Sequence, residues 1–123
     1  DRDQFPKRGN LNKFRKFIDE ENPKKECFLT GKKISGTPSI DHVIPWSYMY
    51  SDDLWNLVYV LPNENSSKSN RLPNKKLIER LKTRNIKLFT TLKNRGINDK
   101  FTEELKLSID NNYVEKFWIG FKG

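Results

Sequence analysis

The sequence predicts an α+β fold, in which a short antiparallel two-stranded sheet and a helix form a core surrounded by additional helices. A stretch over residues 39–43 that carries the β-branched Ile40 and Val43 stops shortly before Pro45, and an apolar run over residues 57–61 stops at Pro62. Runs of this length beside proline are typical of short strands. Apolar residues at helical spacing lie on both sides of these runs. The 123 residues suffice for one domain with a modest core.

The first part of the chain is expected to be an arm followed by one helix. Residues 1–9 show no periodicity and are typical of a linker or arm, so a single domain is expected over residues 10–123. Asn10 can cap a helix that runs to about Glu21 and ends before Pro23. The apolar side of this helix, which should face the core, carries Leu11, Phe14, Phe17 and Ile18.

The C-terminal part, residues 73–122, is expected to be a helical extension. Pro73 opens a predicted helix to about Arg84, and a second helix is predicted over residues 86–94. The apolar stripe that follows is interrupted near residues 111–112. We expect the extension to pack on the core or on another domain.

Positive charge is concentrated in one segment. The chain has a net charge of +8, and residues 63–95 alone hold ten Lys and Arg against two acids, Glu64 and Glu79. A solvated helix face can explain such a stretch, but a basic segment beside a catalytic motif favours contact with a phosphate backbone. The candidate contact residues are Lys68, Arg71, Lys75 and Lys76.

Polar residues stand at fixed places around the two strands. Asp41 and His42, the only histidine, end the first strand, Asn56 precedes the second, and Asn65 lies in the polar block after it, where a short helix is expected. This order resembles the HNH, or ββα-metal, nuclease family over about residues 27–71. The likeness is to the type with Asp-His first and Asn last, as in phage junction-resolving enzymes and the HNH domain of RNA-guided nucleases.

These residue types suit phosphodiester hydrolysis. An imidazole titrates near neutral pH, so His42 can take a proton from an attacking water. The oxygens of Asp41 and Asn65 are hard ligands that suit one Mg²⁺ or Mn²⁺ ion, which would neutralise charge on the phosphate. Because consecutive residues of a regular strand point to opposite faces, the chain should bend at Asp41 and His42.

The resemblance adds roles that the residues alone do not give. It implies in-line attack that leaves 5′-phosphate and 3′-hydroxyl ends. It also implies that Asn56, the second candidate catalytic residue, braces the loop bearing His42 by hydrogen bonds and does not touch the metal.

A structural zinc is not expected. Many HNH relatives carry a Cys-x-x-Cys pair where this chain has Cys27 and Thr30, and the partner positions that align are Leu61 and Glu64. With one thiolate in place of four, the resemblance implies a turn packed by apolar side chains, and Cys27 is expected to be a small buried hydrophobe.

The loop over residues 45–55 carries aromatic and acidic residues beside the predicted site. Its aromatic rings could stack on bases, but packing is the commoner role, and we expect packing. Asp52 and Asp53 are expected to be solvated turn acids, with support of the site as the alternative.

We therefore expect a divalent-metal-dependent HNH endonuclease that cuts duplex or branched DNA, as a domain of a restriction, phage-defence, homing or recombination protein. One alternative is a non-catalytic nucleic-acid-binding module on a degenerate HNH scaffold. Another is a bacteriocin-like toxin nuclease, whose family usually has more metal histidines than this chain offers. The recognition sequence, the choice between DNA and RNA and the oligomeric state stay open.

Composition narrows the setting. The single Cys27 excludes an internal disulfide and suggests a reducing compartment, so we expect a cytoplasmic location. No run approaches the roughly 18 apolar residues of a membrane span, so no membrane partner is expected. The chain begins with Asp1, not Met, so it is a candidate fragment of a longer protein, and another domain of that protein is a candidate partner.

Overall fold

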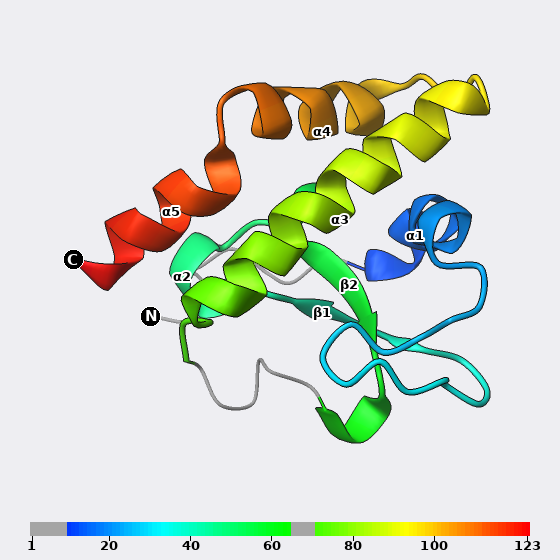
Figure 1. Cartoon of the computed structure of the whole chain (residues 1–123), viewed down its shortest axis with the longest axis horizontal. Helices are drawn as coiled ribbons and strands as arrows, with labels where there is room; N and C mark the ends of the chain where they lie inside the picture. The colour runs from blue at the N-terminus through cyan, green and yellow to red at the C-terminus, as the bar shows by residue number, and fades with distance from the viewer. Residues whose placement is uncertain (1–9, 65–70) are drawn as a thin grey trace.

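The computed structural model describes residues 10–64 and 71–123 (Figure 1). The described part contains five α-helices and two strands: α1 (Arg15–Glu21), β1 (Ser39–His42), α2 (Trp46–Met49), β2 (Leu57–Val60), α3 (Lys75–Asn94), α4 (Lys100–Asp110) and α5 (Tyr113–Lys122). Short 3₁₀ turns at Leu11–Phe14, Leu54–Asn56 and Pro62–Glu64 complete it. The predicted arm, residues 1–9, lies outside the described residues.

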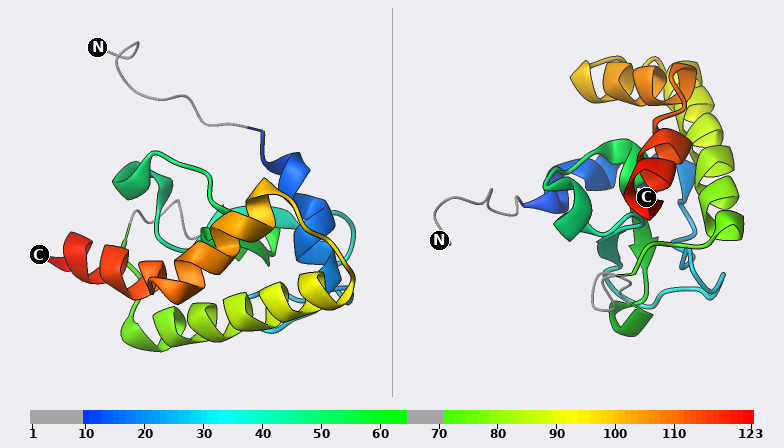
Figure 2. Two further views of the ribbon diagram at one scale, coloured as in Figure 1. Left: turned by 90° about the horizontal axis from the view of Figure 1, so that it is seen from above. Right: turned by 90° about the vertical axis from the view of Figure 1, so that its left-hand side faces the viewer.

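The two strands pair antiparallel, as predicted. Ser39 lies opposite Val60, and His42 lies opposite Leu57. All four residues of β2 are buried, because α3 crosses the sheet and α1 lies beside it (Figures 1 and 2). A two-stranded sheet is marginal by itself, so this helical cover supplies the apolar contacts that stabilise it. The predicted α+β class is confirmed.

The N-terminal helix also follows its prediction. The side chain of Asn10 accepts a hydrogen bond from the backbone N–H of Asn12, which caps a 3₁₀ turn that continues into α1. Phe14, Phe17 and Ile18 are buried in the core. The amphipathic pattern therefore placed this face correctly.

The prediction of two helices over residues 73–94 is wrong, because α3 is continuous. The amide of Asn85 donates to the backbone oxygen of Trp55 at 2.9 Å, and the Arg84 guanidinium donates to the backbone oxygens of Leu54 and Leu57 at 3.1 and 2.6 Å. These polar side chains thus bind the segment that leads into β2, and they do not interrupt the helix.

The predicted interruption near residues 111–112 is confirmed. Asn112 has a left-handed backbone, with φ of 52°, and separates α4 from α5. The indole N–H of Trp118 on α5 donates to the backbone oxygen of Pro73 at 2.7 Å, so the C-terminal helix is fastened to the segment before α3.

The predicted short helix after β2 can be followed only in part. Pro62–Glu64 form a 3₁₀ turn, and residues 65–70, which include Asn65 and Lys68, lie outside the described residues. Within residues 10–64 and 71–123, no helix is both long enough and apolar enough to cross a membrane.

Candidate active site

Asp41 and His42 end strand β1, where the sequence places them. Asp41 lies opposite Val58 in the sheet. Asp41 and His42 are both buried, with exposed fractions of 2% and 5%. The strand stays paired through His42, and the chain bends immediately afterwards at residues 43 and 44. The bend therefore comes one residue later than expected.

His42 is held by an acid that the sequence reasoning assigned to the solvated loop. Nε2 of His42 lies 2.8 Å from Oδ1 of Asp52, and the Asp52 side chain is only 17% exposed. The expectation of a solvated turn acid is wrong for Asp52. The sequence gives no periodic pattern that pairs His42 with an acid ten residues later, because the two groups meet only after the loop has folded back.

Asn56 clamps the backbone that follows His42. Its Oδ1 accepts the N–H of Ile44 at 2.8 Å, and its Nδ2 donates to the oxygen of the same residue at 2.9 Å. The N–H of Val43 donates to the backbone oxygen of Asn56 at 3.0 Å. Since Asn56 is fully buried, these bonds are shielded from water. Its side chain thus extends the strand pairing beyond His42.

The proposed metal ligands can be tested only at Asp41. Its carboxylate is a hard oxygen donor of the type that Mg²⁺ and Mn²⁺ take. It is buried at the end of β1, one residue before His42, and its oxygen is of the type that such an ion takes. Asn65, the other half, lies outside the described residues. In the part of the chain that the structure describes, no three His, Cys, Asp or Glu side chains are grouped to hold a metal.

The turn expected at Cys27 is present. The N–H of Cys27 donates to the oxygen of Lys32, and the N–H of Gly31, at a positive φ of 76°, donates to the oxygen of Cys27, both at 2.7 Å. Sγ accepts the N–H of Leu61 at 3.4 Å. Burial acts to raise the pKa of the thiol, but hydrogen bonds from Thr30 and from the backbone outweigh it, so the pKa lies below its usual value.

A basic cleft borders the predicted site. It has a volume of about 450 Å³ and is lined in part by Val43, Arg71, Lys76 and Arg80. Because Val43 directly follows His42, the cleft opens next to the end of β1. Arg71 and Lys76 are exposed here, as a contact to phosphate requires, whereas Lys68 lies outside the described residues.

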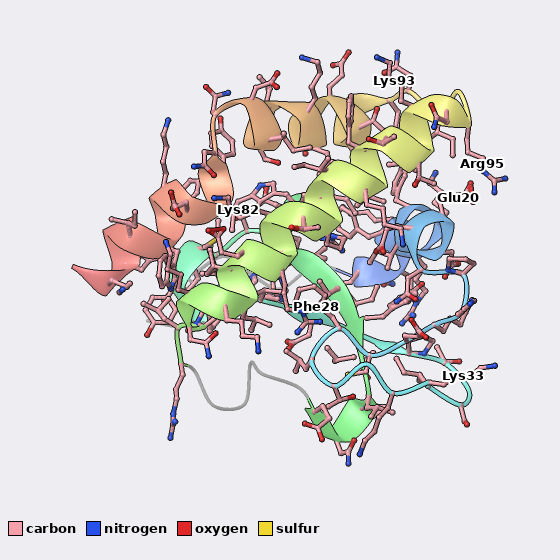
Figure 3. All side chains as sticks on the ribbon, in the orientation of Figure 1. Glu20, Phe28, Lys33, Lys82, Lys93 and Arg95 are labelled. Carbon is pink, nitrogen blue, oxygen red and sulfur yellow. The ribbon has the colours of Figure 1, made fainter. Side chains whose placement is uncertain are left out.

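Much of the remaining basic segment is paired with acids. Lys82 lies 3.1 Å from Glu79 and 3.6 Å from Glu115, and Lys75 lies 3.7 Å from Glu115. Arg95 lies 3.6 Å from Glu20 (Figure 3). Exposed pairs of this kind are weak and screened by salt, so they reduce but do not remove the positive field.

Arg84 is not available to nucleic acid. It is buried, with the carbonyl bonds described above, and burial lowers its pKa to about 10, with Glu21 opposing the shift. Its guanidinium is buried in the core and is bonded to backbone oxygens, so it does not face solvent. The basic segment therefore presents a smaller surface than its composition suggests.

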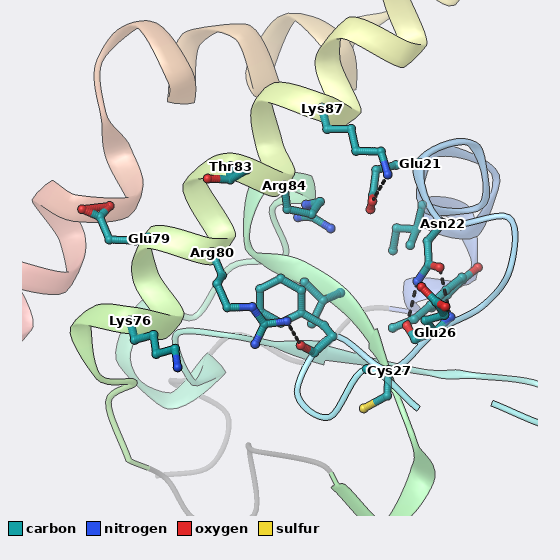
Figure 4. Close-up of a pocket in the computed structure, with 15 residues that line it drawn as sticks. Glu21, Asn22, Glu26, Cys27, Lys76, Glu79, Arg80, Thr83, Arg84 and Lys87 are labelled. Carbon is teal, nitrogen blue, oxygen red and sulfur yellow. Dashed lines mark hydrogen bonds and ion pairs between the residues drawn. The ribbon is translucent and has the colours of Figure 1, made fainter. Parts of the chain in front are cut away.

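A further cavity, of about 650 Å³, lies between α1, the Cys27 turn, β2 and α3 (Figure 4). Neither Asp41 nor His42 lines it. Several of its charged groups engage one another or the backbone: Lys87 lies 3.6 Å from Glu21, and Arg80 donates to the backbone oxygen of Phe28 and covers its ring. The predicted catalytic pair lies elsewhere.

Comparison with known protein families supports the resemblance to HNH nucleases. Residues 27–74 match the family model described as HNH endonuclease, a stretch that includes the Cys27 turn, both strands and the start of the basic cleft. No curated protein and no solved structure matches the chain.

Proposed function

We propose that the chain is a divalent-metal-dependent endonuclease that hydrolyses phosphodiester bonds in DNA, with His42 as the base. The observation that carries this proposal is that Asp41 and His42 end a strand whose following backbone is clamped by Asn56, inside the stretch that matches the HNH endonuclease family. Each group has one task in the reaction.

His42 accepts the proton of the attacking water. An ionised Asp52 accepts a hydrogen bond from Nε2–H, which favours the tautomer whose lone pair is on Nδ1. Nδ1 is then the basic atom. As the ring becomes positively charged, the Asp52 carboxylate stabilises it, and the contact also fixes the orientation of the ring.

Asn56 is a positioning residue. By holding both backbone groups of Ile44, it fixes the chain two residues after His42 and so sets where the imidazole stands relative to Asp41. This agrees with the brace that the family resemblance implies for the same residue.

Asp41 and Asn65 would hold the ion. When bound, Mg²⁺ or Mn²⁺ supplies positive charge that neutralises the phosphate and the leaving oxygen. Asp41 contributes its oxygen from inside the fold, so its carboxylate is shielded from solvent. Arg71 and Lys76 line the adjacent cleft and would bind flanking phosphates, with Lys75 beside them and Lys68 on the segment before Arg71.

One observation favours a second candidate, a non-catalytic nucleic-acid-binding module. The His42 side chain is only 6% exposed, which leaves little ring surface for an attacking water in the free protein. Apo geometry does not exclude a base, because catalytic groups often align only when substrate binds. The two candidates differ in a single observable, metal-dependent cutting.

Cleavage of supercoiled plasmid tests the proposal. We expect cutting with Mg²⁺ or Mn²⁺ that stops on addition of EDTA. His42→Ala should lose at least about 100-fold in rate, the range assigned to a general base. Asn65→Ala, which removes a proposed metal ligand, should be severely impaired. The exposed Asn94 on α3 offers a matched control, Asn94→Ala, which should cut at the wild-type rate. Full activity in purified His42→Ala would exclude the role given to this residue. Salt-sensitive binding without cutting under any metal would favour the second candidate.

A further inference from the structure

An aromatic pocket lies beside the proposed site. It has a volume of about 430 Å³ and forms between helix α5 and the segment from α2 to β2, which lie side by side (Figure 1). Its aromatic walls are Tyr48, Trp55, Tyr113, Phe117 and Phe121. The Trp55 and Phe117 rings are stacked with centroids 5.7 Å apart, and Tyr48 meets Phe121 at 5.4 Å. Two distant parts of the chain thus build one platform of rings.

The rim of this aromatic pocket is polar and belongs to the loop that contacts His42. Ser51 and Asp53 line the pocket, and the Ser51 hydroxyl donates to Oδ2 of Asp53 at 2.6 Å. They flank Asp52, whose Oδ1 lies 2.8 Å from Nε2 of His42. A phosphate at His42 and a base in the pocket would therefore contact the two sides of one short loop.

The pocket has the features that a nucleobase requires. Phe117 is 39% exposed, although it is a large apolar ring beside a polar site, so part of its surface is open to a partner. Aromatic rings bind any base by stacking. The Asp53 carboxylate can accept a hydrogen bond from an exocyclic amino group, as acids do with cytosine. On the neighbouring side of α5, Lys122 lies 4.1 Å from the Trp118 ring and supplies positive charge for the backbone.

We infer that the aromatic pocket binds an unpaired nucleobase adjacent to the cleaved phosphate, so that the chain prefers DNA with a bulged or flipped base over fully paired duplex. This rests on the proposed function, because the phosphate at His42 sets the position of the base. A base within a duplex is stacked on both sides and cannot enter the pocket until it is extruded. The Asp53 carboxylate at the rim favours a base over an apolar protein segment, because Oδ2 already accepts from Ser51 and an apolar segment offers no donor to Oδ1.

Binding of two fluorescent probes tests this inference. One probe is a duplex with a single unpaired 2-aminopurine, and the other is the same duplex with 2-aminopurine paired to thymine. Affinity is measured by anisotropy in EDTA, so that cutting does not interfere, and stacking of the base is measured by quenching of its fluorescence. Wild-type protein should bind the bulged probe more tightly and quench it. Phe117→Ala should weaken that binding about 10-fold while the paired probe is unaffected.

Two further variants keep the outcome clear. Phe117→Tyr retains the ring and should retain the preference, which separates stacking from loss of folding. Ile119→Ala removes another exposed apolar side chain of α5, 56% exposed and outside the pocket, and should change neither probe. Equal affinity for the two probes, or an equal loss for both in Phe117→Ala, would overturn the inference. Self-association that both Phe117→Ala and Ile119→Ala abolish would overturn it too, since the face would then bind a second copy.

The failures of the two proposals are distinguishable. Plasmid cutting without preference for the bulged probe leaves the nuclease and removes the base pocket. Preference and quenching without any metal-dependent cutting support a base-binding pocket on a non-catalytic module.

Discussion

The carboxylate of Asp52 lies 2.8 Å from Nε2 of His42, and the same loop supplies Asn56, which holds the backbone of Ile44. One segment of 15 residues, counted from His42 to Asn56, therefore leaves the strand, returns, and fixes both the ring and the backbone that follows it. This double contact explains how a histidine at the end of a two-stranded sheet can keep one orientation.

Replacing Asp52 by Asn should slow cutting without unfolding the protein. The amide preserves the shape of the side chain but cannot stabilise a positive imidazole, and it can stabilise the wrong tautomer. We expect kcat to fall at least roughly 10-fold with KM little changed, because an acid that orients a catalytic histidine contributes up to about 10⁴-fold to kcat. Steady-state cleavage of plasmid over a range of DNA concentrations measures both constants. Asp110→Asn, at an exposed acid on α4, is the control and should be neutral. An unchanged kcat in Asp52→Asn would remove the role given to this acid.

Asn56→Ala should destabilise the fold. The change removes two buried hydrogen bonds and leaves the N–H and oxygen of Ile44 without partners. Two unsatisfied buried groups predict a loss of about 3 kcal/mol in the free energy of unfolding, measured by urea denaturation. Asn94→Ala, on the exposed end of α3, should change it by less than about 0.5 kcal/mol. A loss below about 1 kcal/mol for Asn56→Ala would show that water replaces the clamp.

The cleft beside His42 should bind phosphate. The double variant Arg71→Ala/Lys76→Ala removes two positive charges and should weaken binding to a fluorescent duplex. The plot of log affinity against log salt should become less steep, its slope falling in magnitude by about 2. Lys100→Ala/Lys106→Ala removes the same charge from α4 and serves as the control. An equal change of slope in both double variants would mean that only net charge matters and that the cleft is not the contact.

Tyr59 predicts a specific alkaline behaviour. Burial, and then the hydrogen bond to Asp19 at 2.7 Å, raise its pKa above the ordinary value of 10.0. Above that pH the unfolded chain loses a proton that the folded protein keeps, so the contribution of this group to stability is complete below pH 10.0 and falls as the pH rises. Between about pH 8 and about pH 11, the stability difference between wild type and Tyr59→Phe should shrink by about 1.4 kcal/mol. Urea denaturation at both values measures it, and a constant difference would contradict the assignment.

The sequence predicted those elements that depend on interactions between residues close together in the chain. The two strands, the helix that carries Phe14 and Phe17 and the interruption before α5 follow from periodicity and capping, which act over a few residues. The placement of Asp41 and His42 at a strand end also followed, because apolar runs and proline mark such ends. The roles given to these two residues came from the chemistry of their side chains together with the resemblance, and they are proposals.

Long-range contacts were not predictable in the same way. The helix predicted to end near Arg84 continues, and the hydrogen bonds of Arg84 and Asn85 to residues 54–57 satisfy their side chains inside the core. Likewise Asp52 reaches His42 only after the loop has folded back. In each case the partner is at least ten positions away, and no periodic pattern reports which polar groups meet at that separation.

Chemical rescue of His42→Gly by imidazole tests the role of His42 most directly. The glycine variant lacks the base but keeps Asp41 and the clamp at Asn56, and free imidazole can enter the space that the side chain leaves. With Mg²⁺ or Mn²⁺ present, we expect no cutting without imidazole, cutting that rises with its concentration, and no rescue of Asp41→Ala. Cutting by His42→Gly at the wild-type rate in the absence of imidazole would contradict the account.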